Sequence, residues 1–124
     1  MPTIASSATR RFELHGSVFT SYVSPTTSAS TELCGWMLEV APNTPGAEHA
    51  VSNEEMLLVL SGRLTVHIDG VSTTLGPGDV AQVPAGSNFR VHTEIDPARV
   101  WVATTVGLSA ELPDGSTLTP PWAR

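Results

Sequence analysis

The 124-residue sequence predicts a single all-β domain, and three observations support this prediction. Apolar and polar residues alternate with a period of two in several segments, which is typical of strands with one buried face. No window carries the apolar stripe of an amphipathic helix. Turn-forming residues recur about every eight to twelve positions, a spacing typical of a β-sandwich or β-barrel.

The first half of the chain predicts three strands separated by polar loops. Residues 17–24 form an early strand, and the Pro-Thr-Thr-Ser-Ala-Ser segment at 25–30 is a polar loop. Residues 32–40 form a second strand, which Pro42 ends because proline cannot donate to a sheet ladder. Residues 48–51 are short and extended.

The centre of the chain predicts a buried strand followed by a hairpin. Residues 55–60 carry an unbroken apolar run, which is typical of a strand buried on both faces. Residues 63–68 alternate strictly, and Asp69-Gly70 then provides the positive φ angles that a type I′ turn requires. Residues 71–75 form the return strand.

Three further strands, at 80–83, 89–95 and 100–106, complete a set of about nine or ten. The remaining tail contains Pro113, Pro120 and Pro121 and shows no strand period. We therefore expect one domain in three parts, which are an N-terminal strand arm (1–29), a barrel core (30–107), and a C-terminal tail (108–124) that packs on the barrel or on a partner subunit.

Composition excludes several classes of function. The net charge is −6 with only 6 Lys and Arg residues, so no basic patch is available to bind nucleic acid. Cys34 is the only cysteine, which excludes an intramolecular disulfide and a cysteine-based zinc site. The start of the chain lacks a secretory signal, and the longest apolar run is too short to cross a bilayer. We expect a cytoplasmic protein without a membrane partner.

Polar and turn-forming residues between 46 and 93 have the spacing of a metal cage on strands. Gly46 precedes His49 and Val51, and Glu55 is followed after six residues by Gly62. Residues i and i+2 of a strand face the same side, so His49 and Val51 point together. A carboxylate from the next strand can then meet them across a turn.

A second run begins at Gly78, continues through Pro84 and Gly86, and ends at Phe89. Together the two runs resemble the two motifs of the cupin superfamily, in particular its small, single-domain microbial members. The resemblance implies a cupin-type jelly-roll β-barrel, also called a double-stranded β-helix. It also implies a homodimer, because small cupins often pair through outer strands and arms.

The resemblance further implies four metal ligands, three histidines and a glutamate, of which this chain keeps two. His49 and Glu55 match the family's ligands, whereas Val51 and Phe89 replace histidines and have no lone pair to donate. Two protein ligands are fewer than the three that catalytic zinc sites use. We therefore expect either no cofactor or a weakly bound divalent metal such as Fe, Mn, Ni or Zn.

Three other histidines are candidate replacement ligands, and four residues are candidates for the wall of a pocket. His92 faces the opposite side of its strand from Phe89 unless a bulge intervenes, His67 lies on a polar face, and His15 lies in the N-terminal arm. Val51, Phe89, Trp36 and Gln82 are predicted to line an apolar pocket. Core packing for Val51, Phe89 and Trp36 and a solvent-facing position for Gln82 remain alternatives.

Three hypotheses for function follow. In the first, His49 and Glu55 are the catalytic general acid and base of a small enzyme of isomerase, cyclase or lyase type in microbial metabolism. His49 is the expected partner of the Glu55 carboxyl, whose pKa burial should raise. The second is a metal-dependent cupin of dioxygenase type with an unusual ligand set. The third is a non-catalytic sensor or carrier of a small organic molecule.

Overall fold

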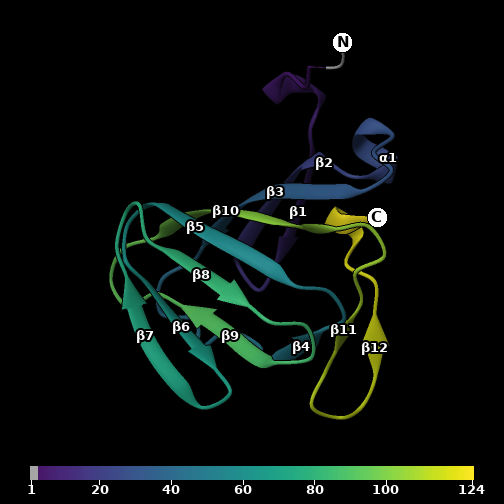
Figure 1. Ribbon diagram of the computed structural model, residues 1–124. Helices are drawn as coiled ribbons and strands as arrows, with labels where there is room; N and C mark the ends of the chain where they lie inside the picture. The colour runs from purple at the N-terminus through teal and green to yellow at the C-terminus, as the bar shows by residue number, and fades with distance from the viewer. Residues whose placement is uncertain (1–2) are drawn as a thin grey trace.

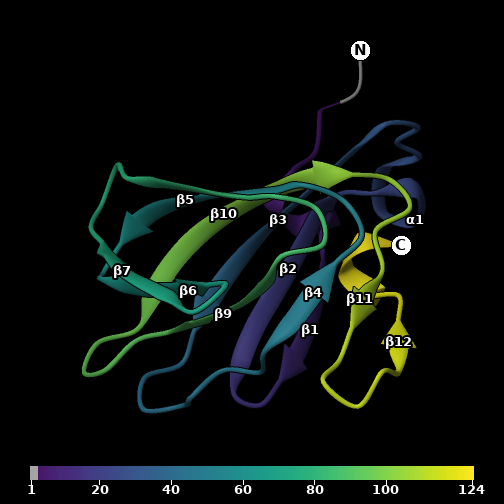
Figure 2. The ribbon, with the colours of Figure 1, turned by 60° about the horizontal axis from the view of Figure 1, so that its bottom comes forward.

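The fold consists almost entirely of antiparallel strands arranged in two facing sheets (Figures 1 and 2). A computed structural model describes residues 3–124, so the first two residues of the predicted arm lie outside the described part. The first sheet has the strand order β1 (Arg10–Leu14), β2 (Ser17–Val23), β3 (Leu33–Val40), β10 (Ala98–Thr105), β5 (Glu55–Ser61) and β8 (Val80–Val83).

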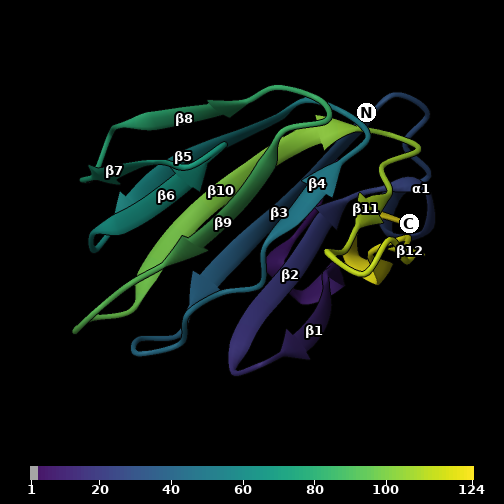
Figure 3. The same ribbon diagram turned by 90° about the horizontal axis from the view of Figure 1, so that it is seen from below.

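The second sheet covers one face of the first, as the view from below shows (Figure 3). Its strand order is β12 (Thr117–Leu118), β11 (Ala110–Glu111), β4 (His49–Val51), β9 (Asn88–His92), β6 (Leu64–Ile68) and β7 (Val71–Leu75). Three short helices complete the described chain, namely η1 (Ser6–Ala8), α1 (Pro25–Ser28) and η2 (Pro121–Ala123). None of the helices in residues 3–124 is long and apolar enough to cross a membrane.

The hydrophobic core lies between the sheets, on the inward face of each strand. On β5, Glu55, Leu57 and Val59 are buried, whereas Met56 and Leu60 are exposed. This period of two results from the pleat of the strand, which sends alternate side chains to opposite faces. The predicted strand at 55–60 is therefore present, but it is buried on one face only.

The hairpin at Asp69-Gly70 forms where the sequence predicts it. Both residues have positive φ, at 47° and 83°, and β6 pairs with β7 in register from Leu64–Leu75 to Ile68–Val71. This agreement reflects local turn chemistry, because few residue pairs other than Asp-Gly and Asn-Gly adopt this conformation readily.

Both ends of the chain contain structure that the alternation did not predict. Residues 10–14 form β1, the segment expected to be a polar loop contains α1, and the tail contributes β11 and β12. The tail lies against the first sheet, where the indole ring of Trp122 stacks on Phe19 with ring centroids 3.7 Å apart. Two-residue strands such as β11 are too short to give a detectable period.

Candidate active site

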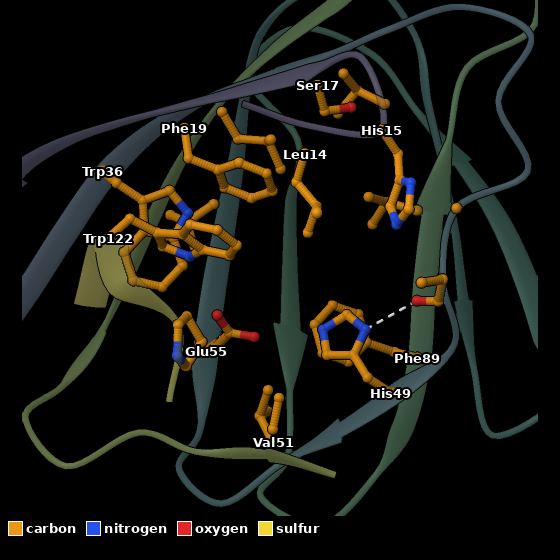
Figure 4. A pocket seen from close by; sticks show the side chains of 18 of the residues that line it. Leu14, His15, Ser17, Phe19, Trp36, His49, Val51, Glu55, Phe89 and Trp122 are labelled. Carbon is orange, nitrogen blue, oxygen red and sulfur yellow. Dashed lines mark hydrogen bonds between the residues drawn. The ribbon is translucent and has the colours of Figure 1, made fainter. Parts of the chain in front are cut away.

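A cavity of about 450 Å³ lies between the two sheets and is lined mainly by apolar side chains. Residues of both sheets, the turn between β1 and β2, the loop before β4 and the C-terminal tail contribute to its wall. Its volume lies within the range of about 300–1,000 Å³ that is usual for small-molecule sites. Figure 4 shows its labelled side chains around a common space.

One wall comes from the paired strands β4 and β9. His49 pairs with Phe89 across the ladder, and their ring centroids are 4.4 Å apart. Val51 faces the same cavity from β4, two residues after His49. The side chains of His49, Val51 and Phe89 are thus brought together, as the strand period predicts.

Glu55 lies at the start of β5 and points into the cavity, where its side chain is 4% exposed. Burial raises the pKa of its carboxyl group from 4.5 to about 7, because the charged form loses its hydration. Within residues 3–124 the carboxyl group makes neither a hydrogen bond nor an ion pair. Near pH 7 the protonated and ionised forms of Glu55 are therefore both populated, and the carboxyl group is free to act on a bound molecule.

His49 has the opposite tendency. Its Nδ1 lies 2.9 Å from the carbonyl oxygen of Ala47, and because a carbonyl can only accept, Nδ1 carries the proton. Burial lowers the pKa of the imidazole below 6.5, an effect that the hydrogen bond to Ala47 partly opposes. The ring is consequently neutral at pH 7, and its Nε2 presents a lone pair.

The expected pairing of His49 with Glu55 does not form. Both side chains line the cavity, but they make no hydrogen bond or ion pair with each other, and burial alone raises the pKa of Glu55. Figure 4 shows them on different parts of the wall, with open space between. The arrangement is a separated proton acceptor and proton donor that face one volume.

Of the two other residues predicted to line the pocket, Trp36 does so and Gln82 does not. Trp36 is 2% exposed, and its indole Nε1 has no hydrogen-bond partner among the described residues. Gln82 lies on the outer face of β8, where its amide donates to the carboxylate of Glu54 at 2.8 Å. The alternation of β8 explains this, because Ala81 and Val83 occupy the inward positions.

Most of the other cavity residues are not predictable from the motifs, among them two aromatic residues and a histidine from the ends of the chain. His15 and Phe19 reach it from the β1–β2 hairpin, and Trp122 reaches it from the C-terminal η2. His15 occupies a turn position with φ of 52°. No local spacing links these segments to the motifs, because tertiary packing alone brings the two ends of the chain to the barrel.

The donor set does not fit a cupin metal centre. Among residues 3–124, no three His, Cys, Asp or Glu side chains gather closely enough to hold a metal ion. His67 and His92, the candidate replacement ligands on β6 and β9, lie on the outer face of the second sheet. There the Nε2 of His67 is 3.0 Å from the Nδ1 of His92, and Ser72 bonds to the other nitrogen of His67.

Comparison with solved structures shows that the fold is shared. The polyketide cyclase RemF from Streptomyces resistomycificus matches with a TM-score of 0.72 and 17% identity, over 85% of this chain and 79% of that chain. The nucleoside dehydratase Pac13, from a Streptomyces, matches with a TM-score of 0.69 and 16% identity, over 85% and 82%. An RmlC-like cupin from Shewanella frigidimarina gives 0.67 and 18%, over 82% and 86%.

A search of the sequence against curated proteins gave no match. The family model described as "Cupin domain" matches residues 36–104, which run from within β3 to the end of β10 and include His49, Glu55 and Phe89. This match covers more than half of the chain, and the two antiparallel sheets form the jelly roll of the solved cupin structures. The chain is therefore a member of the cupin family.

Proposed function

We propose that this cupin is an enzyme of isomerase, cyclase or lyase type that moves protons on a small organic molecule. The observation that carries the proposal is a buried carboxyl group and an imidazole that face one apolar cavity without bonding to each other, where burial raises the pKa of the carboxyl group to about 7 and lowers that of the imidazole. A polyketide cyclase and a nucleoside dehydratase have the same fold, which is compatible with such chemistry.

His49 is the general base of this proposal and Glu55 is the general acid. The Nε2 lone pair of His49 takes a proton from a carbon of the substrate, and the C–H electron pair forms a new double bond. Glu55 gives its proton either to a hydroxyl group, which then leaves as water, or to a carbonyl oxygen, which becomes the hydroxyl group of an enol. The two groups end as imidazolium and carboxylate, and exchange with water restores them.

A Kemp elimination tests this proposal without knowledge of the natural substrate. In 5-nitrobenzisoxazole, a base removes the C3 proton, the C–H electron pair forms the nitrile, and the N–O bond breaks to give a single coloured product, a cyanophenolate. The chain contains no lysine that could act as a competing base. We expect catalysis that His49→Ala lowers by about 100-fold or more, because general bases contribute roughly 10²–10⁴-fold.

The pH dependence of the same reaction distinguishes base from acid. The rate should rise through the pKa of His49, which lies below 6.5, and fall through that of Glu55 near 7. Glu55→Ala should remove the fall, and His67→Ala, on the outer face, serves as the control. If His49→Ala and the wild type react at the same rate, the proposed role of His49 is wrong.

We also propose a homodimer that forms through the outer face of the first sheet. Met56 and Leu60 are each 42% exposed on β5, Val80 is 49% exposed on β8, and Trp101 lies half-buried beside them on β10. Six strands at about 4.8 Å spacing, each roughly 20 Å long, give a face of roughly 600 Å². That is comparable with the area of about 800 Å² per partner in stable interfaces.

A further inference from the structure

We infer that the cavity binds an uncharged, planar aromatic ketone whose ring lies between two aromatic walls and whose carbonyl oxygen accepts a hydrogen bond from Glu55. This inference rests on the proposed function, since it names the class of molecule on which the acid and the base act. It also selects a neutral ligand over a cationic or an anionic one, which the proposed chemistry alone does not decide.

Aromatic side chains on two sides of the cavity favour a flat ring. Phe19, Trp36 and Trp122 form one wall, with Phe19 and Trp122 stacked at 11°. His49 and Phe89 form another wall, and Figure 4 shows the two groups facing each other across the space. Aromatic groups attract a further ring in offset or edge-to-face contact, beyond the gain from buried area.

The lining of the cavity disfavours an anionic ligand. Among the described residues that line it, Glu55 is the only one with a carboxyl group and none is an arginine, while the whole sequence contains no lysine. A carboxylate or phosphate would therefore be buried without a cationic partner, at a large cost in free energy. It would also repel Glu55 in its ionised form.

The cavity offers an ammonium ligand fewer of the hydrogen-bond partners it needs than it offers a carbonyl ligand. An ammonium group brings three N–H donors, all of which need acceptors when they are buried. Near Glu55 the cavity wall is formed by apolar groups such as Val51, Trp36 and Trp122, and the polar residues Ser17 and His15 lie at the opposite end (Figure 4). A carbonyl oxygen, in contrast, is satisfied by the single proton of the Glu55 carboxyl group.

Three probes that share a 2-substituted naphthalene ring test the inference. 2-Acetylnaphthalene is the ketone, 1-(2-naphthyl)ethylamine replaces the carbonyl by a protonated amine, and 2-naphthoate is the anion. Binding of each to the full chain is measured by titration calorimetry from pH 5.5 to 8.5. The proteins are the wild type, Glu55→Gln, Glu55→Ala and the control Glu54→Gln, whose carboxylate lies outside the cavity and accepts from Gln82.

We expect the ketone to bind at least about tenfold more tightly than the amine or the anion at pH 6. Glu55→Gln, which keeps a donor, should bind the ketone within about twofold of the wild type, whereas Glu55→Ala should lose about tenfold, as expected for one buried hydrogen bond. The wild-type affinity should fall above pH 7, and that of Glu55→Gln should stay constant. Glu54→Gln should behave as the wild type does.

Tighter binding of the amine, with an affinity that rises through pH 7, would overturn the inference, and so would equal ketone affinity in wild type and Glu55→Ala. The Kemp elimination, measured on the same samples, separates this failure from failure of the proposed function. If His49→Ala loses the elimination rate but the wild type prefers the amine, the acid–base function stands and the ketone is rejected as the ligand. Ketone binding without any elimination supports the ligand class and rejects the enzyme.

Discussion

At Glu55, burial links the protonation state of one side chain to the stability of the whole domain. Its pKa is about 7 in the folded protein and close to 4.5 when the chain is unfolded. Below pH 4.5 both states hold the proton. Between pH 4.5 and 7 the unfolded state releases it first, so the free energy of unfolding falls as pH rises and levels off above pH 7.

We therefore expect Glu55→Gln to be more stable than the wild type at pH 8 and equal to it at pH 4. The pH interval corresponds to about 3 kcal/mol, at about 1.4 kcal/mol for each pH unit. Urea unfolding at both pH values measures the difference, with Glu54→Gln as the exposed control. A gap that is the same at pH 4 and pH 8 would contradict the raised pKa.

At Val51 and Phe89, two apolar side chains occupy positions where the family has histidines. Phe89 pairs with His49 across β4 and β9, and Val51 lies on the same face of β4. The double substitution Val51→His and Phe89→His should therefore complete a set of four donors with His49 and Glu55. Three imidazoles and a carboxylate suit nickel or zinc.

We expect the double variant to bind about one equivalent of Zn²⁺ by calorimetry and the wild type to bind less than about a tenth of an equivalent. Adding Glu55→Ala to the double variant should weaken this binding at least about tenfold. A double variant that stays folded but does not bind zinc would mean that these four positions do not converge. Stoichiometric zinc binding by the wild type would contradict the account of its donor set.

At the scale of elements, two motif glycines serve different purposes. Both have positive φ, +73° at Gly46 and +83° at Gly86. A Cβ atom at Gly46 would overlap the carbonyl oxygen of Val91, whereas at Gly86 there is open space. Gly46 therefore permits both a left-handed turn and the close approach of the loop before β4 to β9.

Gly86→Ala should destabilise the protein by about 1 kcal/mol, which is the cost of the backbone conformation alone. Gly46→Ala should cost at least about 1–3 kcal/mol more, because the backbone must move to admit the methyl group. Urea unfolding of the two variants gives the comparison. Equal losses would contradict the close approach at Gly46.

Most strands were predictable because they depend on local turn residues and alternation. The contacts of the chain ends were not predictable, because they depend on tertiary packing. The Asp69-Gly70 turn and the alternation around it located β6 and β7, and the motif spacing put His49 and Glu55 at one cavity. The contribution of Phe19 and Trp122 to that cavity could not be predicted. It depends on contact between segments about a hundred residues apart, to which no periodicity applies.

At the scale of the whole molecule, the outer face of the first sheet should control assembly. The variant Met56→Glu with Leu60→Glu should be a monomer in analytical ultracentrifugation, because it buries charges in the proposed interface. The matched control, Val71→Glu with Ile95→Glu, changes two residues that are more exposed, at 68% and 82%, and lie away from this face. It should remain a dimer. A monomeric wild type would reject the proposed homodimer.

The protonation of Glu55 is the central claim, since the function, the ligand class and the pH dependence all follow from it. It can be measured directly by NMR titration of the side-chain carboxyl carbon in protein labelled with ¹³C-glutamate, with Glu55→Gln to assign the signal. We predict a midpoint near pH 7. A midpoint near 4.5, the ordinary value for glutamate, would contradict the account.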